Sequence, residues 1–271
     1  MRNTALLQIR DLTVRFSDSV PPAVRAVSIR VDTGTRVGII GESGSGKSVT
    51  AMSILRLNDE RIARYGDESS ITLDGEEILK APISGIERAR GAKVSMIFQD
   101  PMSVLNPVFR VGHQVRDVLV AHRPEQRKKA RAFVVDSLDA VGIRNPAEVY
   151  RKYPHELSGG MRQRVMIAMA IASSPKLLIA DEATSALDVT VQAAVLETIG
   201  TLADDRGMAV LMITHDMGVV ARFCDFVYVM YHGQVVESGA AADILTSPQH
   251  EYTQKLLASV PRLDAHRFRT A

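Results

Sequence analysis

The chain has 271 residues, of which 46% are hydrophobic and 24% are charged, and its formal net charge is +2 at pH 7. This length suits one large domain or a core with an inserted subdomain. The near-neutral charge gives no indication that nucleic acid is the main partner. Cys224 is the only cysteine, which excludes disulfides and thiolate clusters within the chain and fits a reducing compartment.

The N-terminus and the apolar runs argue against a targeting or membrane-spanning segment. Residues 1–10 carry charges at both ends and no long apolar stretch, so we expect no signal peptide. The longest unbroken apolar run is at residues 165–172, whereas a transmembrane helix needs about 20 apolar residues. We therefore expect a soluble chain, whose role at any membrane would need another polypeptide.

The first part of the chain is expected to form a β-rich layer. Residues 6–16 alternate well enough for a strand with a turn at Arg10 and Asp11, and residues 26–31 alternate as a second strand. Phe16, at the end of the first strand, is the aromatic residue best placed to stack on a base, and a place in the core is the alternative.

A glycine-rich octapeptide follows at residues 41–48, GESGSGKS, and it fits the phosphate-binding pattern G-x-x-x-x-G-K-[ST]. Residues 36–40 predict a buried strand before it and residues 49–57 a helix after it, as this loop requires. Its glycines let backbone N–H groups point toward phosphate oxygens, and the helix adds the positive end of its dipole. Lys47 can reach the β- and γ-phosphates, and Ser48 can offer its hydroxyl to Mg²⁺. The predicted nucleotide-binding stretch is Gly41, Glu42, Ser43, Gly44, Ser45, Gly46, Lys47, Ser48 and Val49.

A second pair of predicted strands precedes the middle of the chain. Asp74 and Gly75 indicate a hairpin turn within residues 70–79, which completes the antiparallel part. Residues 93–98 predict a further strand that ends at Gln99. A glutamine at the carboxyl end of a core strand can reach a metal ion or a water, although glutamine is common at strand ends.

The character of the chain changes at about residues 101–164, where we expect a helical insert. Residues 111–121 and 125–141 have helical spacing. The basic run at residues 123–131 is expected to be a solvated helix face, with a binding role as the alternative. Ser158, Gly159 and Gly160 precede a predicted helix at residues 161–173 and form either an anion-ready helix start or an ordinary N-cap.

Apolar strands and helices alternate in the second half, which is typical of a parallel sheet covered on both faces. Residues 176–180 end in Asp181 and Glu182, at the edge where open α/β sheets bind ligands. In a phosphate-loop protein the first acid serves Mg²⁺, and the second can orient or deprotonate a water; a solvated acidic turn is the alternative. His215 follows the strand at residues 208–214 and could bond a γ-phosphate, or be a capping or surface imidazole. The remaining predicted elements are a helix at 189–202, a hairpin of strands 226–231 and 234–238, and helices at 241–245 and 251–259.

The ordered set of motifs is more specific than its members. It comprises the loop at 41–48, Gln99, LSGGMRQ at 157–163, residues 177–182 and 185–188, and His215. Over about residues 5–240 the chain resembles the nucleotide-binding subunit of an ABC transporter, for which the LSGG element is discriminating. The resemblance implies an α/β fold, namely a phosphate-loop NTPase core with an antiparallel β layer and a helical insert. The implied division is a core at 1–100 and 165–240, a helical signature subdomain at 101–164 and a C-terminal tail at 241–271.

The resemblance also implies roles for single residues in binding ATP and Mg²⁺. Phe16 would stack on the adenine, and the loop with Lys47 would hold the phosphates. Ser48 and Gln99 would ligate Mg²⁺, with Asp181 holding the ion mainly through water.

A further set of roles concerns catalysis and the contact between subunits. Glu182 would be the general base that polarises the attacking water, and His215 would bridge the γ-phosphate and that water. The residues that would act across the subunit boundary are Ser158, Gly159 and Gly160, on the ATP held by the partner, and Asp188, in communication. The family works as a dimer around two nucleotides, so the chain alone is expected to hydrolyse ATP slowly.

The resemblance implies partners at the cytoplasmic face of the bacterial inner membrane. They are a second ATPase subunit, homologous but not identical, two membrane permease subunits, and through these an external solute-binding protein, with no nucleic acid. The permease contact would lie between the core and the helical insert, at Asp100, Pro101, Met102, Leu105, Asn106 and Pro107.

The subgroup that the chain resembles is the peptide and nickel importers of bacteria. The resemblance rests on FQDPMSVLNP at 98–107, the signature stretch at 157–172 and HEYT at 250–253. Glu251 stands where the subgroup often has proline, and the chain stops at Ala271 without a cysteine-rich extension. This shortness favours nickel or metallophore importers without deciding between peptide and metal-chelate cargo. A non-transport ATPase of the same superfamily, acting on nucleic acid or ribosomes, and a regulator without turnover are the alternative functions.

Overall fold

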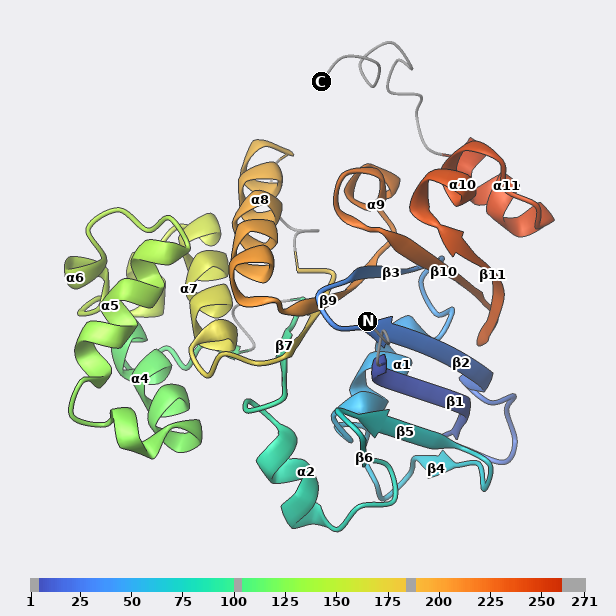
Figure 1. Ribbon diagram of the computed structural model, residues 1–271, viewed down its shortest axis with the longest axis horizontal. Helices are drawn as coiled ribbons and strands as arrows, with labels where there is room; N and C mark the ends of the chain where they lie inside the picture. Colours follow the sequence, from blue (N-terminus) through green and yellow to red (C-terminus); the bar gives the residue numbers. More distant parts are fainter. Residues whose placement is uncertain (1–4, 100–103, 184–188, 260–271) are drawn as a thin grey trace.

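The computed structural model describes residues 5–99, 104–183 and 189–259 of the chain. Two sheets and the helices around them make up this part of the molecule, as Figure 1 shows. The first sheet is antiparallel, with the strand order β2-β1-β5-β6 and with β4 paired to β1. Its strands are β1 (Ala5–Arg15), β2 (Val24–Asp32), β4 (Arg64–Tyr65), β5 (Ser70–Leu73) and β6 (Glu76–Glu77).

The antiparallel sheet forms because β1 and β2 alternate apolar and polar residues with the period of a strand. Ile9 pairs with Ile29, and Leu12 pairs with Val27, and all four side chains are buried. The turn predicted at Arg10 and Asp11 is wrong: β1 continues through these residues. The register shifts between Ile9 and Leu12, and Asp11 has φ 46°, so the irregularity is a bulge inside one strand.

The second sheet has six strands in the order β11-β10-β3-β9-β8-β7. Neighbouring strands from β10 to β7 are parallel, and β11 pairs antiparallel with β10. Every residue of β8 and β9 is buried, as expected for parallel strands covered on both faces. The strands are β3 (Arg36–Ile40), β7 (Val94–Ile97), β8 (Leu177–Asp181), β9 (Ala209–Thr214), β10 (Phe226–Tyr231) and β11 (Gln234–Ala240).

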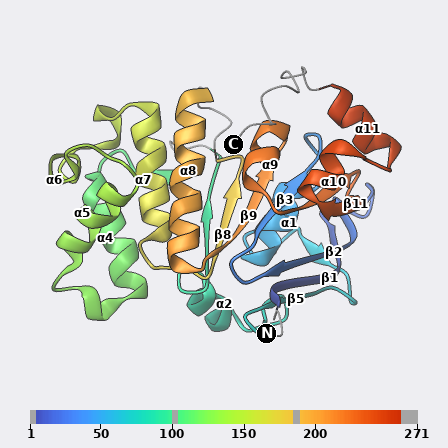
Figure 2. The same cartoon turned by 45° about the horizontal axis from the view of Figure 1, so that its top comes forward.

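Alternate residues of the central strands supply two separate cores. Leu178 of β8 packs in one core with helices that lie over that face of the sheet, whereas Leu177 packs in the other core with the antiparallel sheet. In Figure 2, α7 and α8 lie beside the strands, and α4, α5 and α6 lie on the far side of α7. The helices that contribute to the first core are α4 (Val111–His122), α5 (Ala130–Ala140), α6 (Pro146–Val149), α7 (Gly159–Ile171), α8 (Val189–Arg206) and α9 (Met217–Phe223).

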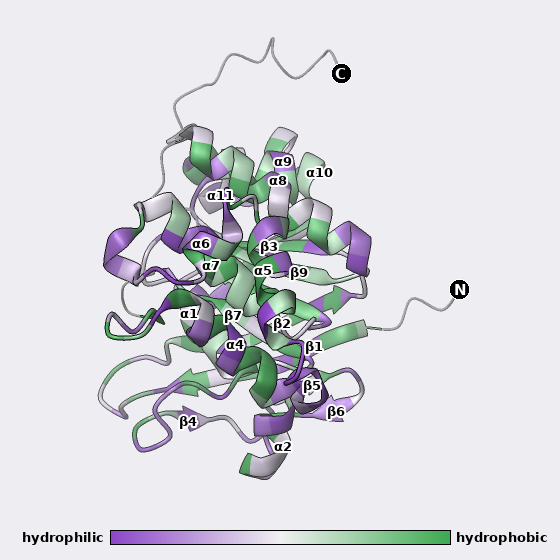
Figure 3. Cartoon of the chain, turned by 90° about the vertical axis from the view of Figure 1, so that its left-hand side faces the viewer, coloured by the Kyte–Doolittle hydropathy of each residue, from purple (hydrophilic) through white to green (hydrophobic). Residues whose placement is uncertain are grey.

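The other helices cover the remaining surfaces. The second core includes residues of α1 (Lys47–Ile54) and α2 (Ile83–Ala89), and a third core joins β10 to α9, α10 (Ala241–Thr246) and α11 (Glu251–Ala258). In Figure 3 the central strands are mostly hydrophobic, whereas the edge strands β4 and β6 are hydrophilic. In the described ranges of the chain, we find no helix with both the length and the apolar character needed to cross a membrane.

Several local predictions from the sequence need correction. The helix predicted at 125–141 is the shorter α5, preceded by a 3₁₀ turn, η1 (Pro124–Gln126), because Pro124 begins a separate turn. The helix predicted at 49–57 begins at Lys47 and ends at Ile54. α2, α6 and α9 were not predicted, nor was the 3₁₀ turn η2 (Pro154–Glu156). α7 begins inside the range assigned to the helical insert and continues beyond it, so the division into subdomains stays a prediction.

Candidate functional site

The candidate phosphate loop lies between β3 and α1, where the sequence predicts it. Two of its glycines are required by close approach of neighbouring backbone. Gly46 has φ 100°, and a Cβ there would lie 2.6 Å from the carbonyl oxygen of Ala23. A Cβ on Gly41 would collide with the carbonyl oxygen of Met230. The loop is therefore wedged between the start of β2 and β10, and only glycine fits at these two positions.

Lys47 occupies the centre of the loop and is only 5% exposed. Its Nζ donates hydrogen bonds of 2.8 Å to the carbonyl oxygens of Gly41 and Glu42. Burial lowers the pKa of Lys47, and the nearby carboxylates Glu182, Asp181 and Glu42 oppose that shift. The ammonium group is thus held by weak neutral acceptors, which an anionic ligand could replace with a stronger partner.

An acidic residue faces the first turn of α1. Asp181 ends the buried strand β8, and its Oδ1 accepts a hydrogen bond of 3.1 Å from Ser48 Oγ. Burial is the main cause that raises the pKa of Asp181; the Ser48 hydrogen bond and the charge of Lys47 act in the opposite direction. The contact joins the phosphate loop to the carboxyl edge of the parallel sheet, as predicted for residues that share one site.

Three side chains from the ends of neighbouring strands meet next to this pair. Gln99, after β7, donates from Nε2 to Glu182 Oε2 at 2.7 Å. His215, after β9, lies with Nδ1 3.2 Å from Glu182 Oε1. The structure therefore brings together the glutamine, the second acid and the histidine that the sequence identified at separate strand ends.

The backbone of Glu182 is held in an uncommon conformation. Its φ is 44°, in the left-handed region that costs a non-glycine residue free energy, and its N–H donates to the carbonyl oxygen of Ile213 at 2.9 Å. Since the carboxylate is also contacted on both oxygens, the side chain is oriented by its surroundings.

The Ser158 turn has N-cap geometry. Ser158 Oγ accepts a hydrogen bond of 3.3 Å from the N–H of Met161 at the start of α7. A Cβ on Gly159 would meet no atom within 4 Å, whereas one on Gly160 would lie 3.1 Å from Val191. Among the hydrogen bonds of the described residues, none joins Ser158 to the loop at 41–48. The turn therefore presents an open face, and its predicted role toward a second subunit stays a prediction.

The remaining predicted site residues are less informative in the structure. Phe16 is half-buried and packs against the core between the two sheets, so both alternatives for this ring stay open. Asp188 lies outside the described residues, as do Asp100, Pro101 and Met102. Leu105 is buried in the core and cannot present its side chain to a partner, whereas the neighbouring Val108 and Phe109 are exposed.

Two contacts at the site were not found from the sequence. Gln163, on the buried face of α7, donates from Nε2 to the carbonyl oxygen of Ala183, directly after Glu182. Tyr252 in α11 accepts a hydrogen bond of 2.9 Å at its hydroxyl oxygen from the N–H of Glu42 in the loop. A polar residue within the apolar stretch of α7 is a signal for the first contact, but no sequence pattern indicates its partner.

The chain is similar to known proteins over most of its length. Residues 24–185 match the family model described as ABC transporter, and residues 236–270 match the one described as the C-terminal region of oligopeptide/dipeptide transporters. The probable D,D-dipeptide transport ATP-binding protein DdpD of Escherichia coli (strain K12) is 50% identical over 239 residues, which are 88% of this chain and 73% of that protein. The peptidoglycan transport ATP-binding protein YejF of Agrobacterium fabrum (strain C58) is 48% identical over 259 residues.

The alignments cover different shares of this chain and of the proteins that it matches. The alignment with YejF covers 95% of this chain but 47% of YejF, so the chain spans about half the length of that relative. A solved structure of the ATP-binding cassette MJ0796, a dimer in a post-hydrolysis state bound to ADP and Pi, superposes with a TM-score of 0.74. It is 25% identical and covers 87% of this chain and 98% of the solved chain. From its motifs, its fold and these matches, we conclude that the chain belongs to the ABC transporter family.

Proposed function

We propose that the chain binds and hydrolyses ATP as a subunit of a bacterial ABC importer that takes up peptides. The observation that carries the proposal is the convergence of four side chains beside the phosphate loop. Ser48 bonds Asp181, and Glu182 is contacted by Gln99 and His215. A loop that receives phosphates, next to an oriented carboxylate and an imidazole, is suited to phosphoryl transfer to water.

The loop would bind the triphosphate through its backbone N–H groups and through Lys47. In the described structure Lys47 Nζ bonds the carbonyl oxygens of Gly41 and Glu42. The β- and γ-phosphates would replace these neutral acceptors, because a charge-assisted hydrogen bond is stronger than a neutral one. Phe16 would stack on the adenine, and the amides from Ser43 to Val49 would surround the phosphate oxygens.

The donor set beside the loop fits Mg²⁺, which prefers oxygen ligands and keeps several waters. The hydroxyl of Ser48 and a carboxylate oxygen of Asp181 already lie 3.1 Å apart, and Gln99 adds an amide oxygen. We propose that Ser48 and Gln99 would ligate the ion directly and Asp181 mainly through water. The ion would supply neutralisation of negative charge on the phosphate oxygens.

Glu182 is the proposed general base. Its carboxylate would accept a proton from the attacking water, and His215 would hold that water and the γ-phosphate in line. The contacts from Gln99 and His215 support this role because they orient the carboxylate before a nucleotide arrives. Gln99 donates to Glu182 through Nε2, so its Oε1 is the atom that would be available to ligate the ion.

The Ser158 turn would complete the site of another subunit. We propose that Ser158, Gly159 and Gly160 contact the ATP of a second cassette subunit, with Asp188 acting at the same boundary. The open face at Gly159 supports this arrangement. A helix N-terminus next to small residues offers backbone N–H groups and dipole charge to an anion.

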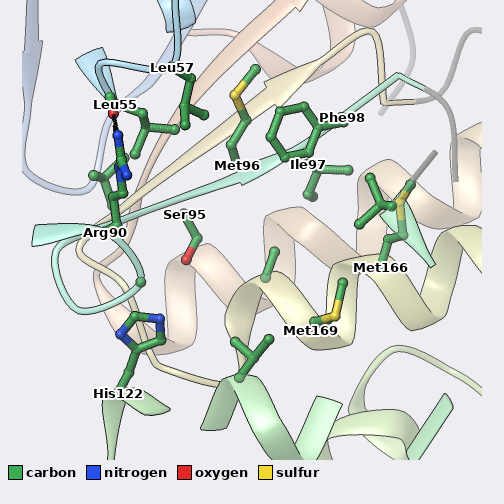
Figure 4. Close-up of a pocket in the computed structure, with 15 residues that line it drawn as sticks. Leu55, Leu57, Arg90, Ser95, Met96, Ile97, Phe98, His122, Met166 and Met169 are labelled. Atoms are coloured by element: carbon green, nitrogen blue, oxygen red, sulfur yellow. Dashed lines mark hydrogen bonds between the residues drawn. The ribbon is translucent and has the colours of Figure 1, made fainter. Parts of the chain in front are cut away.

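A groove between β7 and the helices α4 and α7 is the proposed contact with the permease subunits. It has a volume of 220 Å³, and Figure 4 shows Met96, Phe98, Met166 and Met169 along it. Arg90 is at one end, where its guanidinium donates to the carbonyl oxygen of Leu55. Apolar, methionine-rich walls suit the insertion of a short segment from a partner.

The relatives support transport, with peptides as cargo. The named relatives are transport ATP-binding proteins, and the C-terminal match is to oligopeptide/dipeptide transporters. They favour peptide over nickel or metal chelates, and import over an ATPase that acts on nucleic acid or ribosomes. The chain would lie at the cytoplasmic face of the inner membrane, with two permease subunits and, through them, an external solute-binding protein. Its second cassette subunit would be homologous but not identical.

The variant Lys47→Ala tests the phosphate assignment. Removal of the ammonium group is expected to weaken ATP binding by at least about tenfold, since each 1.4 kcal/mol corresponds to a factor of ten. Nucleotide titration of the purified chain measures the change. Lys176→Ala is the matched control, because Lys176 pairs with Asp74 at the surface and its loss should leave the affinity unchanged. Unchanged ATP affinity in Lys47→Ala would contradict the assignment.

A further inference from the structure

The C-terminal helix α11 reaches the phosphate loop through one side chain. Tyr252 accepts a 2.9 Å hydrogen bond at its hydroxyl oxygen from the N–H of Glu42, the second residue of the loop. The two residues are 210 positions apart in the sequence. Tyr252 is only 7% exposed, so little of its side chain is accessible to water. It lies within residues 236–270, the range that matches the oligopeptide/dipeptide transporter C-terminal region.

The position of Tyr252 is itself fixed by several contacts. Its ring stacks on Tyr231 of β10, with centroids 4.0 Å apart and planes inclined by 26°. His250 caps α11, since its Nδ1 accepts a hydrogen bond of 3.1 Å from the N–H of Tyr252. The carboxylate of Glu237 in β11 accepts from the N–H groups of Gln249 and His250, at 2.7 and 3.1 Å. The helix start is therefore anchored to the sheet.

Apolar side chains of α11 pack in the same core as the end of β3. Tyr252 and Leu256 share a core with Ile40, the last residue of β3 before the loop. The strand end, the loop and α11 therefore belong to one packed unit, and a hydrogen bond at this point acts on the entry of the loop.

Glu42 is held by hydrogen bonds at both its backbone N–H and its carbonyl oxygen. Its N–H is bound by Tyr252, and its carbonyl oxygen accepts from Lys47 Nζ at 2.8 Å. If Lys47 turns to a triphosphate, its own contacts with the carbonyl oxygens would be lost, whereas Glu42 would keep the contact with Tyr252 at its N–H and the 3.2 Å hydrogen bond from the Ser45 N–H at its carbonyl oxygen. Of these two contacts, the hydroxyl of Tyr252 is the one that comes from outside the loop.

We infer that Tyr252 is a positioning residue for the phosphate loop, through which the C-terminal region sets the affinity for nucleotide. The inference rests on the proposed function, since it assumes that the loop binds ATP. It also gives α11 a role at the nucleotide site. The phenyl ring supplies packing on Tyr231, and the hydroxyl supplies the contact with the loop, so the two contributions can be separated by one substitution.

Tyr252→Phe removes the hydroxyl and keeps the ring. We expect ATP and ADP to bind about 3- to 10-fold more weakly, the range given by one backbone hydrogen bond. The KM for ATP should rise by a similar factor, with kcat at saturating ATP within about twofold of the parent, because the hydroxyl does not touch the reacting atoms. Amide hydrogen exchange in a peptide that covers residues 41–48 should be faster.

Tyr228→Phe is the matched control. The hydroxyl of Tyr228 also bonds backbone, accepting from the N–H of Arg30 at 3.0 Å, but it does so between β10 and β2. This variant should lose a comparable amount of stability and keep the parent affinity and loop exchange. Glu237→Gln loosens the start of α11 without touching the loop, and it should weaken ATP binding by about twofold.

The outcomes are distinct. Failure of the parent chain to bind ATP would overturn the proposed function. A parent that binds ATP together with a Tyr252→Phe variant of equal affinity and equal loop exchange would overturn the role of Tyr252. Equal losses of affinity in Tyr252→Phe and Tyr228→Phe would also overturn it, because the effect would then follow from general stability.

Discussion

Lys47 and Asp181 are both buried at the site, and burial shifts the pKa of each toward its neutral form. Each is compensated by neutral hydrogen-bonding groups, the carbonyl oxygens of Gly41 and Glu42 for Lys47 and the hydroxyl of Ser48 for Asp181. A buried charge with such partners destabilises the fold relative to a neutral isostere. These two charges would serve the proposed binding of a nucleotide and Mg²⁺ more than the stability of the fold.

Asp181→Asn should therefore stabilise the nucleotide-free chain at pH 7. The folded pKa of Asp181 lies above its ordinary value of 3.8, so the folded state binds the proton more tightly than the unfolded state. Stability contributed by protonated Asp181 is present below pH 3.8 and is lost as pH rises through the folded pKa. At pH 7 we expect Tm to increase by about 2–4 °C, which corresponds to about 1 kcal/mol in a chain of this size.

Thermal unfolding between pH 4 and pH 8 measures this effect. The advantage of Asp181→Asn over the parent should decrease toward acid pH, because protonation of the folded Asp181 carboxyl removes the cost of burying its charge. A parent that is more stable than Asp181→Asn at pH 7 would show that the ionised carboxylate stabilises the fold. The same variant should weaken magnesium-dependent nucleotide binding.

The residues that the structure brings together beside the loop could be predicted from the sequence because their signals are local. The loop has a fixed spacing, and Gln99, Asp181 and His215 each follow a recognisable strand. The contact between Tyr252 and Glu42 could not be predicted, because it depends on the packing of a C-terminal helix against a strand from the first forty residues.

Among the elements, α7 connects the Ser158 turn to the acidic edge of the sheet. It begins at that turn, and its Gln163, 2% exposed, donates to the carbonyl oxygen of Ala183. Movement of the helix would therefore be transmitted to the backbone next to Glu182. The Ser158 turn and Gln163 both lie at the N-terminal part of α7, so one rigid segment joins the proposed contact with a second subunit to the backbone beside Glu182.

Gln163→Leu should break this link. The substitution preserves apolar packing but leaves the buried carbonyl of Ala183 without that donor, which costs about 1–3 kcal/mol. Denaturant unfolding measures the loss. Gln254→Leu is the control, because Gln254 donates to the carbonyl of Pro248 at an exposed position where water can replace it. Equal stability of the two variants would contradict the role given to Gln163.

The elements were predicted well where hydrophobic periodicity is strong. Residues 36–40 form β3 with the predicted limits, and β8 and β9 each begin one residue later than predicted. α9 was not predicted because its seven residues are too few to show helical periodicity. Its start is nevertheless capped by Asp216, whose carboxylate accepts from the N–H groups of Gly218 and Val219. The hairpin predicted around Asp74 and Gly75 is formed by β5 and β6, although β6 has only two residues. The short strand β4 is formed by sheet pairing, which a sequence of two residues does not reveal.

In the whole molecule, the two sheets and the helical layer leave the loop, the acids and the Ser158 turn on separate elements. In the proposed arrangement, ATP binds between the loop of one subunit and the Ser158 turn of another. Binding of ATP would bring the two subunits together, and hydrolysis would weaken the contact that ATP makes between them. The groove at Met96 and Met169 would couple this closure to the permease.

We propose above all that Glu182 is required for ATP hydrolysis but not for ATP binding. The variant Glu182→Gln tests this role most directly. The amide keeps the size of the side chain but cannot accept a proton from water, so the closed pair should persist with bound ATP. We expect ATP affinity within about twofold of the parent and steady turnover lower by about 10²- to 10⁴-fold, the usual contribution of a general base. Steady turnover at the parent rate would remove Glu182 from catalysis and contradict the account.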